Sequence, residues 1–227
     1  MTASAAKTFV RSERAALCDL FDKLGPDHPT LCAGWETHDL AAHLWIREND
    51  PIGAGGIAIK PLGGWYERRA AEAKQRWPYA ELVDKIRVGP RTLSPFAIPG
   101  VDAAANSLEF FVHHEDVRRA GDAAQPARPL DPEVEDLIWR RLKLLARGWF
   151  RRAQVGVVLE RLDGARDAGG SAGPDSIRAV AGSPIVTLVG EPSELLLFAN
   201  GRTSVAEVKI IGEPAAIDLL HAADLRV

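Results

Sequence analysis

The sequence predicts an α+β fold in two parts, a helical bundle over residues 1–153 and a small α/β domain over residues 154–227. Apolar residues recur at helical spacing through most of the first part. From Val155 onward, short runs rich in valine and isoleucine are typical of strands instead. The stretch GDAAQPARPL, rich in proline and alanine, interrupts the pattern and is interpreted as a surface linker within the first part.

Each helix of the first part has a recognisable start or stop. The first ends at Gly25-Pro26, and Thr37 is expected to cap the second. Gly121 closes a long helix, and Asp131-Pro132 gives an N-cap followed by proline at the first helical position. The glycine-rich stretch IGAGGIAIKPLGGW is interpreted as a connection. Helices are therefore predicted over residues 9–24, 38–48, 65–75, 79–87, 102–120 and 132–149.

The second part alternates strand and helix signals. The stretch DGARDAGGSAGPD is interpreted as an exposed loop between two strands. Strands are predicted over residues 155–162, 176–182, 184–190 and 205–212, and helices over residues 193–200 and 214–223.

Composition excludes several classes of function. The 227 residues carry a net charge of −3 without a lysine or arginine cluster, which argues against nucleic-acid binding. No stretch approaches about 18 uncharged apolar residues, so no membrane span is expected. The N-terminus lacks the pattern of a signal peptide, and a reducing cytoplasm suits the two cysteines, although one disulfide stays open. We expect a cytoplasmic protein, either a monomer or a homodimer.

One helix carries a candidate metal site. In NSLEFFVHHEDVRRA, Glu109 and His113 lie one turn apart on the same face, whereas His114 points about 100° away. A carboxylate and an imidazole at this spacing can converge on one ion, and zinc accepts both. On the second predicted helix, His43 lies in a polar stripe with Asp39 and is the candidate third ligand.

Two alternatives stay open at this point. Glu109 and His113 can simply form a buried hydrogen-bonded pair without a metal, because such motif matches are common. If a metal binds, Asp39 or Asp116 is a candidate acceptor for the far N–H of a ligand histidine. Cys32 is interpreted as a small buried residue rather than a reactive thiol near the site.

The run TLCAGWETHDLAAHL followed by EFFVHHEDVRRA resembles the metal-binding bundle of the mycothiol-dependent maleylpyruvate isomerase-like family, within the DinB-like superfamily. That family combines a tryptophan, a capped D-L-x-x-H-L helix and a later E-x-x-x-H or H-x-x-x-H helix. The tail GSPIVTLVGEPSELLLFANGR…AEVKIIGEPAAIDLL looks like the family's sterol-carrier-protein-like domain. The similarity covers nearly the whole chain.

The resemblance implies a four-helix bundle in which three side chains bind one divalent metal ion, zinc. The three ligands match His43, Glu109 and His113. It implies mycothiol as a thiol cofactor and an isomerase or S-transferase that acts on a small molecule. Fold does not determine substrate, however. A non-catalytic metal-binding or ligand-binding module is the alternative function, and catalytic and cofactor-binding residues are not assigned.

Overall fold

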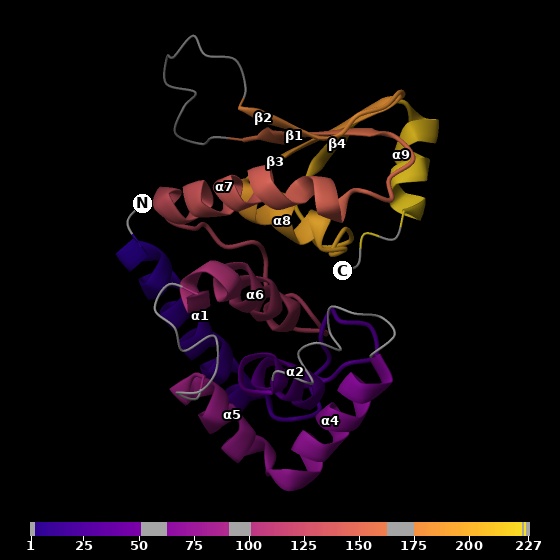
Figure 1. Ribbon diagram of the computed structural model, residues 1–227. Coiled ribbons are helices and arrows are strands. Elements are labelled where there is room, and N and C mark those ends of the chain that lie inside the picture. Colours follow the sequence, from indigo (N-terminus) through magenta and orange to yellow (C-terminus); the bar gives the residue numbers. More distant parts are fainter. Residues whose placement is uncertain (1–2, 51–62, 91–100, 163–174, 224, 226–227) are drawn as a thin grey trace. The chain divides into compact units, whose positions relative to one another are not determined.

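The computed structural model describes residues 3–50, 63–90, 101–162, 175–223 and 225. This part of the chain contains eight helices and one four-stranded mixed sheet, which confirms the α+β class (Figure 1). Residues 52–62 of the predicted glycine-rich connection and residues 163–174 of the predicted loop lie outside the described residues. No helix in the described part combines the length and apolar character needed to cross a bilayer.

The chain divides into two compact units, Met1–Pro126 and Ala127–Val227. The predicted boundary after residue 153 therefore falls inside the second unit. The reason is α7 (Pro132–Trp149), which packs on α8 (Pro192–Ala199) and on strand β2 (Ser176–Val180). An amphipathic helix buries its apolar stripe wherever a complementary face is available, and sequence spacing alone does not identify that face.

Among its described residues, the first unit contains five helices and no strand, apart from an isolated antiparallel bridge between Pro29 and Glu36. Helix α1 packs against α5 and α6, and α2 packs against α4 and α5. Its core contains fully buried side chains such as Leu17, Phe21 and Leu40. The helices are α1 (Ala3–Leu24), α2 (Thr37–Asn49), α4 (Gly63–Arg76), α5 (Tyr79–Val88) and α6 (Val101–Arg118).

The second unit is a mixed sheet with helices α7 and α8 on one face (Figure 1). The strand order is β2-β1-β3-β4, with β1 and β3 parallel and the two outer pairs antiparallel. Alternate residues such as Val157, Leu159, Val186 and Leu188 are fully buried, as a half-covered sheet requires. The remaining elements are β1 (Gly156–Arg161), β3 (Ile185–Gly190), β4 (Lys209–Ile211) and α9 (Pro214–Ala222).

Most predicted elements form, but the N-terminal cap of α2 and the length of β4 differ from the prediction. Helix α2 is capped by Glu36 rather than by Thr37, because the backbone N–H of Glu36 donates to Asp39 Oδ2 at 3.1 Å. Strand β4 is shorter than predicted because the N–H groups of Val205 and Ala206 both donate to the carbonyl of Arg202, forming turns. Asp131 caps α7 as expected.

Candidate metal centre

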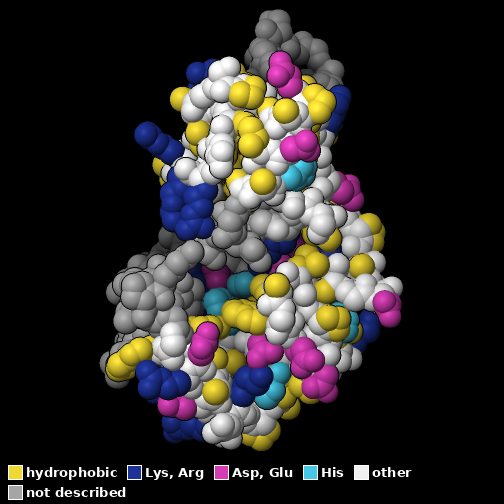
Figure 2. Space-filling view, turned by 90° about the vertical axis from the view of Figure 1, so that its right-hand side faces the viewer, with side chains coloured by type: hydrophobic (Ala, Val, Ile, Leu, Met, Phe, Trp, Pro, Cys, Tyr) yellow, Lys and Arg dark blue, Asp and Glu magenta, His cyan; other side chains and the backbone are white. Residues whose placement is uncertain are grey.

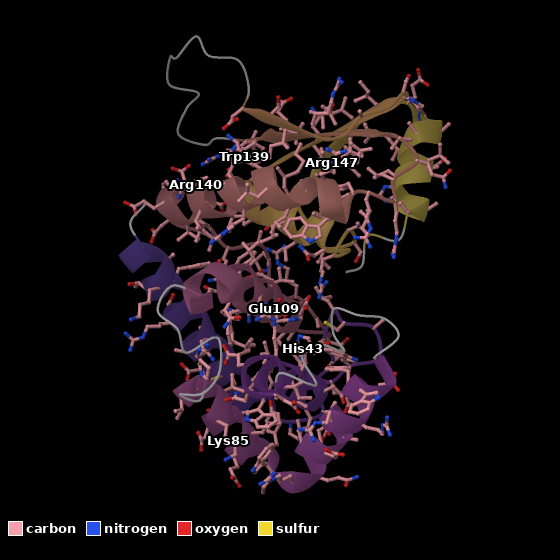
Figure 3. All side chains as sticks on the ribbon, in the orientation of Figure 1. His43, Lys85, Glu109, Trp139, Arg140 and Arg147 are labelled. Atoms are coloured by element: carbon pink, nitrogen blue, oxygen red, sulfur yellow. The ribbon has the colours of Figure 1, made fainter. Side chains whose placement is uncertain are left out.

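The three predicted ligands meet inside the first unit. His43 lies on α2, and Glu109 and His113 lie one turn apart on α6. Glu109 Oε1 is 3.1 Å from His43 Nε2 and 3.2 Å from His113 Nε2. Figure 3 shows His43 and Glu109 close to one another from their two helices. The structure therefore brings together the side chains that sequence spacing could only suggest.

The spacing of these donor atoms fits zinc. Zinc lies about 2.0–2.2 Å from nitrogen and carboxylate ligands in a tetrahedral site, so two such donors are about 3.3 Å apart. The two measured contacts fall within about 0.2 Å of that separation. His43, Glu109 and His113 each offer one ligand atom, and these atoms all lie within 4.8 Å of one another. The three donor atoms are therefore close enough together to share one ion.

The far nitrogen of each histidine also has a partner. His113 Nδ1 lies 2.8 Å from Oδ2 of Asp116, which is fully buried. His43 Nδ1 lies 3.2 Å from the hydroxyl of Tyr66 on α4. Such partners fix the orientation of an imidazole ring. Asp116 thus makes the contact with His113 that was predicted for it, whereas Asp39 instead forms an ion pair with Lys74 at 2.6 Å.

Charges in the site are strongly coupled. Burial alone would raise the pKa of Glu109, but hydrogen bonds from His113 and His43 outweigh it and hold that pKa well below its usual range. Burial would lower the pKa of His113, yet contacts with Asp116, Cys32 and Glu109 raise it well above its usual range. Burial lowers the pKa of His43. Both shifts favour an ion pair between a protonated His113 and an ionised Glu109 when no metal is bound.

A polar network continues from the site into the interior. Arg47 Nε lies 3.1 Å from Glu109 Oε1, and Arg47 also donates to Asn106 Oδ1. Asn106 Nδ2 donates at 2.6 Å to Glu48, whose carboxylate pairs with Arg14 at 2.5 Å. Sequence reasoning missed Asn106, although its position three residues before Glu109 places it on the same helix face.

Aromatic side chains form one wall of the centre. The Trp35 ring lies 5.2 Å from the His43 ring and stacks on Tyr66 at 6.2 Å. Both aromatic residues also line a cleft of about 350 Å³, together with Asp39 and Lys74. Figure 2 shows histidine side chains reaching the surface on the face it displays. Tyr66 carried no sequence signal, because only the packing of α4 on α2 brings it to His43.

Two further residues lie close to the site. His114, which points away from the ligand face as predicted, is buried, and its Nδ1 lies 2.9 Å from Glu13 Oε2 on α1. Cys32 is half-buried, and its thiol donates to Asp116 Oδ2 at 3.2 Å. The two cysteines are thiols and are not joined in a disulfide.

Comparison of the chain with protein-family models, with curated proteins and with solved structures finds no match.

Proposed function

We propose that the first unit binds one divalent metal ion, zinc, through His43, Glu109 and His113, and that it serves a mycothiol-linked transferase or isomerase of a small molecule. The observation that carries the metal site is the convergence of two Nε2 atoms on one carboxylate oxygen, at 3.1 and 3.2 Å. Three protein ligands leave a tetrahedral zinc ion one further position, which is the pattern of catalytic rather than structural sites.

The residues around the ligands have distinct tasks. Asp116 fixes the ring of His113, and Tyr66 fixes the ring of His43. Arg47 adds positive charge beside Glu109, which favours an anionic partner such as a thiolate or a carboxylate. When bound, zinc supplies Lewis-acid polarisation and lowers the pKa of a coordinated thiol or water.

The cleft beside the site supports a small-molecule role. It is lined by Trp35 and Tyr66, which contact His43, and by charged side chains of α2 and α4. A site with aromatic walls and a few polar groups is typical of small-ligand binding. The thiol itself and the family assignment rest on the resemblance of the two sequence motifs.

The first test is elemental analysis of purified full-length protein. We expect about one zinc per wild-type chain, and its loss in His43→Ala and His113→Ala, because two remaining ligands bind zinc weakly. His114→Gln is the matched control, since His114 is a buried histidine of the same helix that contacts Glu13 rather than the ligands. A wild-type chain unable to take up zinc would reject the site.

The second test asks whether the bound metal ion accepts a thiol as a further ligand. Cobalt(II) replaces zinc in the Cys32→Ser variant, which removes the protein's own thiol next to Asp116. Mycothiol is then added. A new sulfur-to-cobalt charge-transfer band would support an open position that accepts a thiol. Bound cobalt whose spectrum mycothiol leaves unchanged would favour the alternative, a non-catalytic metal-binding module.

A further inference from the structure

A second group of metal-binding side chains lies behind His113. Cys32 Sγ, Asp116 Oδ2 and His113 Nδ1 each offer a ligand atom, and these atoms lie within 4.8 Å of one another. Asp116 Oδ2 is central, 3.2 Å from the thiol sulfur and 2.8 Å from the ring nitrogen. The proposed zinc site uses Nε2 of the same ring, so these atoms are not among its ligands.

From these contacts we propose that Cys32, Asp116 and Nδ1 of His113 form a second cation site, selective for soft ions such as cadmium or copper(I). A thiolate combined with an imidazole and a carboxylate is a soft or borderline donor set. The half-exposed Cys32 gives the ion a path from solvent, whereas Asp116 is fully buried.

The geometry needs only a small expansion. In a tetrahedral zinc site, a carboxylate oxygen lies about 3.6 Å from a thiolate sulfur and about 3.3 Å from an imidazole nitrogen. The hydrogen-bonded distances of 3.2 and 2.8 Å are each shorter by about 0.4–0.5 Å. Cys32 lies in the connection between α1 and α2 rather than within a helix.

Ion binding at this position is a proton exchange. The thiol of Cys32 loses its S–H proton and His113 loses its Nδ1 proton, both to solvent, and bonds from the ion to sulfur and nitrogen form in their place. His113 Nε2–H continues to donate to Glu109. No electron is transferred and no oxidant is needed. The two sites therefore use opposite nitrogens of one imidazole ring.

The test is a cadmium titration of full-length His43→Ala protein, which lacks a ligand of the proposed zinc site. We expect an ultraviolet sulfur-to-cadmium charge-transfer band that saturates near one equivalent. The band should vanish in His43→Ala with Cys32→Ser and persist in His43→Ala with Cys18→Ser, because Cys18 is fully buried on α1. Circular dichroism checks that every variant is folded.

Asp116→Asn, introduced into the His43→Ala protein, tests whether the Cys32 thiol binds cadmium without Asp116. Loss of one of three ligands should weaken cadmium binding by roughly tenfold or more, since even partners outside the ligand shell contribute 10–100-fold in known sites. Unchanged affinity in this variant, or no band in the parent, would overturn the proposal. Neither result bears on the zinc site, which is tested by metal content in the wild type.

Discussion

The two units bury different kinds of side chain. Among the described residues, the interior of the first unit contains a connected set of charged and polar groups, including Arg14, Glu48, Asn106 and Asp116. The second unit buries mainly leucine and valine, with Glu135 and Glu194 as its buried carboxylates in the described range. Burying a charge is costly unless it is paired and hydrogen-bonded. The first unit meets this requirement around a candidate site, whereas the second uses its interior for packing.

The largest effect is expected from breaking the buried ion pair of the first unit. Glu48→Ala leaves Arg14 buried without its bidentate carboxylate and should lower the free energy of unfolding by about 3–5 kcal/mol. Urea unfolding of the full chain measures this loss. Replacing both residues, Arg14→Met with Glu48→Leu, should recover only part of it, because Asn106 Nδ2 still lacks its acceptor on Glu48. A single variant as stable as wild type would contradict the role given to the network.

In the second unit, the corresponding test is a substitution that leaves a cavity in the apolar interior. Leu188→Ala removes a fully buried side chain from β3 and should lower the free energy of unfolding by about 2–5 kcal/mol. Because this loss arises from packing rather than charge, it should change little between low and high salt. Urea unfolding at two ionic strengths checks both points. A strong salt dependence would contradict the distinction drawn between a second unit stabilised by packing and a first unit that buries paired charges.

Zinc should stabilise one unit only. At a free zinc concentration about 100 times Kd, the first unit should gain about 2.7 kcal/mol, because the ion binds its folded state. Calorimetry should show the transition of the first unit moving to higher temperature and that of the second unchanged. His113→Ala should abolish the shift. Equal stabilisation of both units would point to non-specific binding.

Without metal, His113 and Glu109 should together stabilise the first unit most between about pH 4.5 and 6.5, and the lowered pKa of His43 should move the optimum to the upper end of that window. The raised pKa of His113 gives stability that is complete below the unfolded value of 6.5 and is lost as pH rises through the folded pKa. The lowered pKa of Glu109 gives stability that is present above 4.5 and is lost as pH falls through the folded pKa. Thermal unfolding across pH checks this window, and His113→Gln should remove its upper limit.

The smallest effect concerns the buried carboxylate of the second unit. Burial raises the pKa of Glu135, which accepts hydrogen bonds from the backbone and side chain of Ser193 at 2.9 and 2.7 Å. A raised carboxyl pKa costs stability as pH rises from the unfolded value through the folded one. Glu135→Gln preserves the shape and can retain both contacts, so its stability relative to wild type should increase modestly with pH. A difference independent of pH would mean that folding leaves the pKa of Glu135 unchanged.

Much of the fold follows from local sequence patterns. Helix starts such as Asp131-Pro132 and the valine-rich run of residues 155–162 are short-range signals, and both elements form as predicted. The position of α7 did not follow from its sequence, because an apolar stripe does not identify its partner, and packing on α8 and β2 places this helix in the second unit. The DinB-like bundle, the sterol-carrier-like domain and the cytoplasmic location stay predictions.

The sequence by itself determined that Glu109 and His113 share one helix face, since a spacing of four residues dictates it. Tertiary structure decided that His43 from α2 meets them, that Tyr66 supports His43, and that Cys32 reaches Asp116. Contacts between residues far apart in the chain depend on how helices pack, and packing depends on every side chain in the interface. A single helix can therefore specify half of a site, while the fold must supply the rest.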